Sequence, residues 1–245
     1  MSNVIDRFMY DGTIEGFLTV VKYCIDQKVM PRQIKPEAVV GRTAEYDHYQ
    51  FIRSDYAVAD KLYKFVGRRS SAEVQQMISD LFLTCIPNME MDLFIMICKA
   101  IKYGAVIAED YQDELMRRIQ FSIRDMYREA ASVLRGLNVS RIDNVAFSVI
   151  NPRNTVLPVI FKSILRDEAY DDVLIYDKRH RMVLIRIDEK DVILDLTRVR
   201  KADFRSIDDL YKNLWPYFRS EHGAVTRQVH KEKADELSKL WYIAV

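Results

Sequence analysis

The segment Met9–Val21, MYDGTIEGFLTVV, decides how the N-terminal part of the chain folds. Its first apolar residues predict a short strand, and Asp11-Gly12 is a typical turn pair because glycine readily adopts a positive φ. Thr13 can cap the helix that follows, and Glu15 places negative charge in its first turn. Apolar residues then recur at helical spacing, which predicts one buried helix face. The segment therefore predicts a strand, a tight turn and an amphipathic helix.

The remaining hydrophobic pattern divides the chain into a helical half and a half that contains strands. Residues 31–36 read as a loop marked by two prolines, and 49–52 as a short strand. The pattern then predicts helices over 54–69, 71–84, 89–104 and 108–136, strands at 145–150, 173–176, 182–187 and 192–196, and terminal helices at 207–218 and 231–241. We therefore predict an α+β fold, with a mainly helical half over 1–140 and an α+β half over 141–245 that holds a small antiparallel sheet. The two halves either pack closely as separate domains or form one domain.

Composition and charge restrict the class of protein. The chain has 245 residues, of which 49% are hydrophobic, so it can bury a sizeable core. A net charge of +1 excludes a protein that coats DNA with its whole surface, so any nucleic-acid contact must be a local patch. The sequence shows no signal peptide and no uninterrupted apolar span, and Cys24, Cys85 and Cys98 form no CxxC pair. We therefore expect a cytoplasmic protein without a membrane partner.

A row of arginines on the predicted helix 108–136 is the clearest candidate site. The row consists of Arg117, Arg124, Arg128 and Arg135. This spacing confines the side chains to an arc of about 40° along roughly 27 Å of helix. Guanidinium groups suit bidentate contact with phosphates or carboxylates, so we expect the row to bind nucleic acid. Two alternatives remain open: a protein-binding face, and a solvated face whose local ion pairs involve Glu114, Asp125 or Glu129.

A second basic cluster lies in the predicted turn between strands 173–176 and 182–187. Lys178, Arg179 and Arg181 are its candidate nucleic-acid-binding residues, and His180 lies among them. A charged run in a turn is also typical of an ordinary solvated loop. If the turn lies beside the arginine row, the two form one anion-binding surface.

Sites of other kinds find little support in the sequence. Tyr10, Asp11 and Glu15 could form a polar cleft at the start of the first predicted helix, but the segment has neither a P-loop nor a GxGxxG motif. The histidines lack metal-ligand spacing, no cysteine has an activating context, and no GxSxG motif is present. We therefore expect no metal and no cofactor. A catalytic role for Asp177 is less economical than ordinary polarity at a strand end.

Three sequence blocks resemble one family in the same order along the chain. The blocks are YDGTIEGFLTVV at 10–21, NPRNTVLPVI at 151–160 and LIYDKR at 174–179. They are similar to those of the bacterial proteins called probable DNA metabolism proteins, which are encoded beside a radical SAM protein. The C-terminal half resembles a domain that elsewhere is fused to a uracil-DNA-glycosylase-like domain. The resemblance implies a setting in DNA metabolism or repair, and a radical SAM protein or another DNA-metabolism enzyme as partner.

The chain also departs from that family. Where the family carries a His-Arg pair on its central helix, residues 129–136 read EAASVLRG. The first hypothesis is a non-enzymatic accessory protein that binds DNA through the arginine row and acts with a partner enzyme. The second is an adaptor or inhibitor that binds only protein, which the missing polar positions and the near-neutral charge favour. The third is a DNA-acting enzyme with a site between its halves.

Overall fold

A computed structural model of the chain describes residues 6–41, 46–142, 145–165, 172–187 and 190–195. The fold is mixed α+β, as predicted. The chain divides into two compact units, Met1–Asp125 and Met126–Val245. This division falls within the long helix α6 (Glu114–Arg135), before the expected boundary at residue 140. Each unit is described below by itself.

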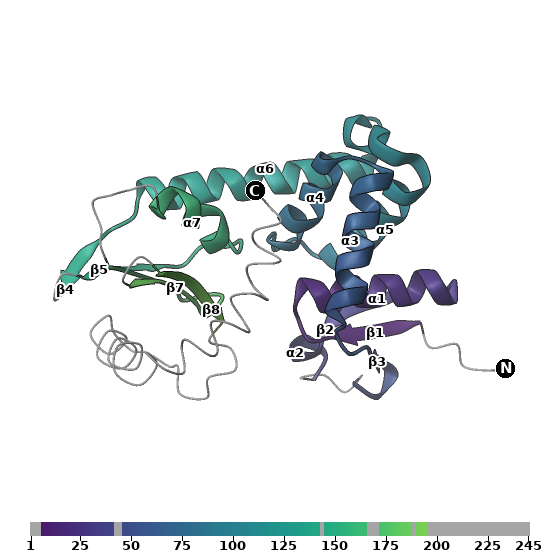
Figure 1. Ribbon diagram of the computed structural model, residues 1–245, viewed down its shortest axis with the longest axis horizontal. Helices are drawn as coiled ribbons and strands as arrows, with labels where there is room; N and C mark the ends of the chain where they lie inside the picture. Colours follow the sequence, from purple (N-terminus) through teal and green to yellow (C-terminus); the bar gives the residue numbers. More distant parts are fainter. Residues whose placement is uncertain (1–5, 42–45, 143–144, 166–171, 188–189, 196–245) are drawn as a thin grey trace. The chain divides into compact units, whose positions relative to one another are not determined.

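Unit 1 begins with a strand–helix–strand motif (Figure 1). Strand β1 (Arg7–Tyr10) leads through the Asp11-Gly12 turn into α1 (Ile14–Gln27), as the sequence predicts. Gly12 has a φ of 87°, and the Thr13 hydroxyl accepts the Gly16 N–H at 3.0 Å, which caps the helix. Strands β2 (Gln33–Pro36) and β3 (Gln50–Phe51) both pair in parallel with β1, which gives the order β2-β1-β3.

One prediction for this sheet was wrong. Residues 31–36 were expected to form a loop, whereas 33–36 form β2. The two prolines mislead because β2 is an edge strand that ends at Pro36, where a missing N–H does not interrupt the ladder.

The helices of unit 1 surround a large apolar core. Phe17, Leu81, Leu93 and Ile97 are among its fully buried side chains. Asp55 and Ser71 cap α3 and α4 through their side chains, each accepting an N–H three residues later. The elements are α2 (Glu37–Val40), η1 (Tyr46–His48), α3 (Tyr56–Arg69), α4 (Ala72–Phe82), α5 (Met89–Tyr103) and η2 (Gly104–Glu109), followed by the first part of α6.

Unit 2 contains the end of α6, the helix α7 and a five-stranded sheet. Its elements are β4 (Ser140–Ile142), β5 (Val145–Ile150), α7 (Leu157–Leu165), β6 (Asp172–Asp177), β7 (Met182–Ile187) and β8 (Lys190–Asp195), in the sheet order β4-β5-β6-β7-β8. An antiparallel sheet was expected, but β5 and β6 pair in parallel, so the sheet is mixed. Two parallel neighbours need a crossover connection, and α7 lies in the chain between them.

The two terminal helices predicted at 207–218 and 231–241 lie outside the described residues. No helix in the described ranges is both long and apolar enough to cross a membrane.

Candidate nucleic-acid interface

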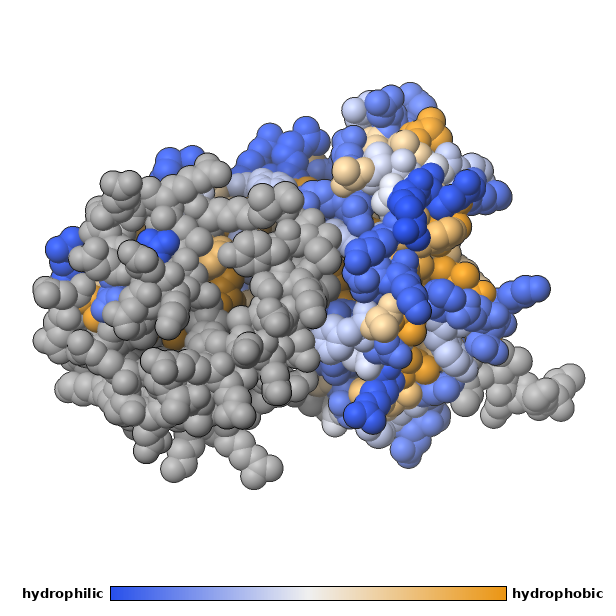
Figure 2. Space-filling view, viewed as in Figure 1, coloured by the Kyte–Doolittle hydropathy of each residue, from blue (hydrophilic) through white to orange (hydrophobic). Residues whose placement is uncertain are grey.

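Helix α6 is amphipathic, and the arginine row lies on its exposed side. Met116, Ile119, Met126 and Ala130 are buried along the opposite side. All members of the row, Arg117, Arg124, Arg128 and Arg135, are exposed. Figure 2 shows hydrophilic residues along the upper edge of the molecule, where Figure 1 draws α6. The helical period therefore places the guanidinium groups in water, as the sequence predicts.

One alternative for the row was a solvated face with local ion pairs to Glu114, Asp125 or Glu129. Among the described residues, no carboxylate forms an ion pair with any member of the row. Glu129, which follows Arg128, instead accepts hydrogen bonds from the loop after β5. The row is therefore exposed and, within the part of the chain that the structure describes, has no carboxylate partner.

Two contacts on the flanks of α6 hold the helix in one rotational setting. On one flank, Arg118 Nε and Nη2 donate to the two carboxylate oxygens of Asp92 on α5, at 2.9 and 2.6 Å. On the other, Gln120 Nε2 donates to the Ala108 carbonyl of η2 at 2.6 Å. Asp92 is only 5% exposed, so the bidentate pair is anchored in the protein body. These contacts turn the side that carries Arg117 and Arg124 toward solvent.

Phe121 is a residue of this surface that the sequence analysis did not single out. Its side chain is 59% exposed. It comes four residues after Arg117 and three before Arg124, which puts it on the same side of the helix. That spacing was the available signal, but the same aromatic residue could equally have been buried against another helix.

The basic turn of unit 2, Lys178–Arg181, joins β6 to β7. Asp177 is 0% exposed, and one carboxylate oxygen accepts the N–H groups of Arg179 and His180 at 3.0 and 3.1 Å. Its other oxygen lies 2.7 Å from His180 Nδ1. Asp177 therefore organises the turn, which agrees with the structural role preferred for it. Lys178 and Arg179 are exposed, whereas Arg181 is half-buried and has a φ of 55°.

Glu129 connects α6 to the carboxyl end of β5. Its two oxygens accept the Arg153 N–H at 2.6 Å and the Asn154 N–H at 2.9 Å, and Asn154 Nδ2 donates to it at 2.6 Å. Burial raises the pKa of Glu129, but these three donors outweigh burial and hold it below its usual range. Asn154 is 2% exposed, and Glu129 accepts hydrogen bonds from both its backbone and its side chain.

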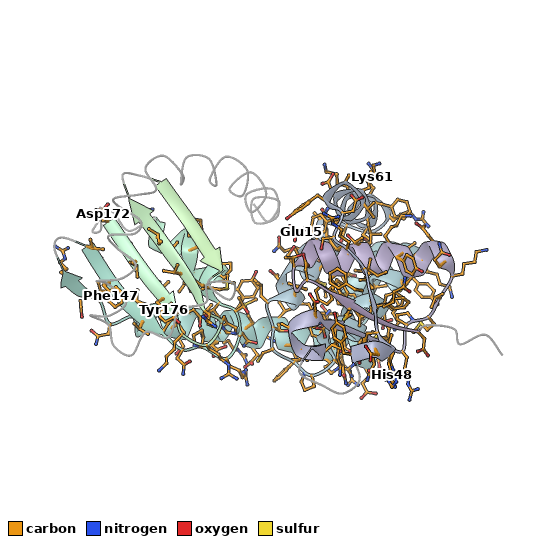
Figure 3. All side chains as sticks on the ribbon, turned by 90° about the horizontal axis from the view of Figure 1, so that it is seen from below. Glu15, His48, Lys61, Phe147, Asp172 and Tyr176 are labelled. Carbon is orange, nitrogen blue, oxygen red and sulfur yellow. The ribbon has the colours of Figure 1, made fainter. Side chains whose placement is uncertain are left out.

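The ends of β5 and β6 lie together in unit 2. Ile150 and Asp177 are paired in the parallel register, and the Lys178 N–H donates to the Ile150 carbonyl at 3.0 Å. Figure 3 shows Asp172 and Tyr176 toward opposite ends of β6, and the basic turn follows the Tyr176 end. The sequence blocks 151–160 and 174–179 are therefore neighbours at the carboxyl ends of β5 and β6. The hydrogen bonds of Glu129 join α6 to this same end of the sheet. The arginine row, however, lies on the opposite side of α6 from the buried Ala130.

The candidate cleft residues of unit 1, Tyr10, Asp11 and Glu15, form a polar cluster at the turn from β1 into α1. Tyr10 and Glu15 are buried, and Figure 3 shows Glu15 at the start of α1. The Tyr10 hydroxyl donates to Glu90 Oε1 at 3.4 Å, and burial raises the pKa of both groups. Asp11 Oδ1 accepts the Thr13 N–H and hydroxyl at 3.1 and 2.6 Å. Asp11 therefore stabilises the strand-to-helix turn.

Metal binding finds no support in the described ranges, which contain no group of three histidine, cysteine or acidic residues placed to hold an ion. Burial raises the pKa of the Cys24 thiol to about 12, which opposes its use as a nucleophile. Comparison with family models, with curated proteins and with solved structures gives no match for this chain.

Proposed function

We propose that this protein is an accessory factor of DNA metabolism or repair that binds nucleic acid through the arginine row and acts with a partner enzyme. The observation that carries the proposal is the state of Arg117, Arg124, Arg128 and Arg135. All are exposed on one side of α6, and none has a carboxylate partner among the described residues.

An arginine without an ion-pair partner can bind a phosphate at a lower free-energy cost than a paired one. An arginine that already forms an ion pair must exchange that partner for a phosphate, which reduces the net gain. The row faces no such exchange with a described carboxylate, so each phosphate contact adds charge-assisted hydrogen bonds and releases counterions from the nucleic acid. The flanking contacts of Arg118 and Gln120 also hold the helix in place, which limits the ordering required on binding.

The setting in DNA metabolism comes from the resemblance of three blocks to the probable DNA metabolism proteins. Two of these blocks, 151–160 and 174–179, adjoin each other at the ends of β5 and β6, where Lys178 and Arg179 are exposed. The closeness of these two blocks to exposed cations supports a second contact with nucleic-acid phosphates in unit 2. A radical SAM protein is the partner that the resemblance favours.

Fluorescence anisotropy with labelled DNA across a salt series tests the proposal. The double variant Arg124→Ala/Arg128→Ala should weaken binding about tenfold or more and reduce the slope of log Kd against log salt by about two. The matched control, Lys61→Ala/Arg68→Ala, removes the same charge from exposed positions on α3 and should change neither value by as much. Equal effects in the two variants, or no binding by the wild type at low salt, would contradict the proposal.

An adaptor that binds only protein is the second candidate, and one observation favours it. Tyr103, Val106 and Tyr111 are large exposed side chains within nine residues of sequence in unit 1. Apolar side chains gathered at a surface often mark a protein interface. If this reading holds, Val106→Asp should abolish capture of a partner while Arg124→Ala/Arg128→Ala leaves it unchanged.

A further inference from the structure

We infer that the surface on α6 is built for single-stranded nucleic acid, with Phe121 as the platform on which an unpaired base stacks. This inference rests on the proposed function and names the substrate class of the same site. Its basis is the position of an exposed aromatic ring inside a row of cations that have no described partner.

Phe121 lies within the arginine row rather than beside it. From Arg117 to Phe121 the helix advances about 6 Å and turns about 40° beyond a full turn, and Arg124 follows about 4.5 Å further on. Including Phe121 widens the arc of the row to only about 60°. Because α6 is one uninterrupted helix, Arg128 continues the same line. The ring is therefore preceded and followed by guanidinium groups.

The exposure of Phe121 needs an explanation that core packing does not supply. The residue is 59% exposed, while Ser122 next to it is buried and donates to the Arg118 carbonyl at 2.8 Å. The contacts of Arg118 and Gln120 lie on the two sides of this position and fix the rotation of the helix. Turning Phe121 inward would break both contacts, so the ring remains in water.

An aromatic ring between phosphate-binding cations favours unpaired bases for a physical reason. A duplex hides the faces of its bases in its own stack and offers mainly its phosphates to a convex helix surface. A single strand can turn a base out onto a ring while neighbouring phosphates contact arginines, and each stacked base contributes about 1–3 kcal/mol regardless of its identity. The surface should therefore prefer single strands and show little sequence preference.

Anisotropy with the full chain tests this inference, using a labelled oligothymidine and a hairpin duplex with the same number of phosphates. Phe121→Ala should weaken binding to the single strand by about 5- to 100-fold and leave binding to the duplex within about twofold. Phe121→Trp should keep the affinity, and its added indole fluorescence should be quenched by the single strand. Phe65→Ala removes an exposed phenylalanine from α3 and serves as the matched control.

Three results would overturn the inference, and they separate it from the proposed function. If Arg124→Ala/Arg128→Ala weakens binding while Phe121→Ala does not, the nucleic-acid function stands and the stacking platform is wrong. Equal losses for single strand and duplex in Phe121→Ala also contradict the preference for unpaired bases. If the wild type binds neither nucleic acid at low salt, both proposals fail.

Discussion

Units 1 and 2 each place polar side chains directly after strands that pair in parallel, but the two sets differ in charge. In unit 1 the end of β1 carries Tyr10 and Asp11, the Tyr10 hydroxyl donates to Glu90, and Glu15 follows in the first turn of α1. In unit 2 the ends of β5 and β6 carry exposed Arg153, Lys178 and Arg179.

Carboxylates play one common role at these ends. Asp11 accepts the Thr13 N–H in unit 1, while Asp177 accepts two backbone N–H groups of the basic turn and Glu129 accepts two in the loop after β5. In unit 1 the side chains that follow β1 are acidic and partly buried, which disfavours a phosphate there. In unit 2 the carboxylates hold backbone and amide donors, and Lys178 and Arg179 are exposed. The two units therefore differ in the charge of the side chains that follow their parallel strands.

The largest effect is expected from removing the carboxylate that anchors the basic end of unit 2. Glu129→Ala should lower the free energy of unfolding of the protein by about 3 kcal/mol, because it leaves three donors without their charged acceptor. Urea denaturation followed by circular dichroism measures the loss. Glu114→Ala, an exposed position on the same helix, is the control and should change stability by less than about 0.5 kcal/mol.

The stability that Glu129 contributes should also depend on pH. The folded-state pKa of Glu129 lies below its ordinary value of 4.5, so its contribution is fully present above that pH. As the pH falls through the lowered folded pKa, the contribution is lost. The stability difference between wild type and Glu129→Ala should therefore shrink at acidic pH. A difference that stays constant would contradict the ionised anchor.

A smaller loss of stability is expected from a substitution at Gly16, which is closely packed against Asp11 and Ser54. A Cβ atom at Gly16 would lie 2.3 Å from Asp11 Oδ1 and 2.7 Å from Ser54 Oγ. Gly16→Ala should therefore lower the free energy of unfolding by about 2 kcal/mol, since Asp11 must give up its position on Thr13. Gly136→Ala, whose nearest neighbour would be 3.4 Å away, is the control for thermal unfolding. Similar melting temperatures for the two variants would show that the cluster is looser than described.

The smallest effect is expected from neutralising Glu90, a half-buried acid of unit 1. Burial raises the pKa of Glu90, so its ionised form costs stability as the pH rises through the folded pKa. Glu90→Gln retains an acceptor for the Tyr10 hydroxyl and should stabilise the protein by about 1 kcal/mol at neutral pH. Below the ordinary pKa of 4.5 the gain should vanish, because wild-type Glu90 is then neutral. Urea denaturation at both pH values measures this, and destabilisation at neutral pH would refute it.

The sequence predicted correctly those features that depend only on local spacing of apolar and polar residues. The exposed arginine row follows from the spacing of Arg117, Arg124, Arg128 and Arg135 on a helix whose other side is apolar. Strands 145–150 and 182–187 were also predicted with the observed bounds, because short apolar runs with turn signals specify them locally.

The remainder depended on contacts between distant residues. The parallel pairing of β5 and β6 requires knowledge of strand order, which alternating apolar residues do not encode. Sequence spacing offered Arg128 as an ion-pair partner for Glu129, whereas the loop after β5 supplies three donors to it from Arg153 and Asn154. Exposure of Phe121 follows from the rotation of α6, which Asp92 and Ala108 set from other elements.

Photocrosslinking tests the central claim, that α6 rather than the acidic end of β1 meets nucleic acid, most directly. The full chain would be irradiated with an oligonucleotide that carries 4-thiothymidine, and the labelled peptides would be mapped by mass spectrometry. The account predicts crosslinks within residues 114–135, with Phe121 among the labelled positions, and their loss in Arg124→Ala/Arg128→Ala. Crosslinks at residues 10–16 with none in 114–135 would contradict it.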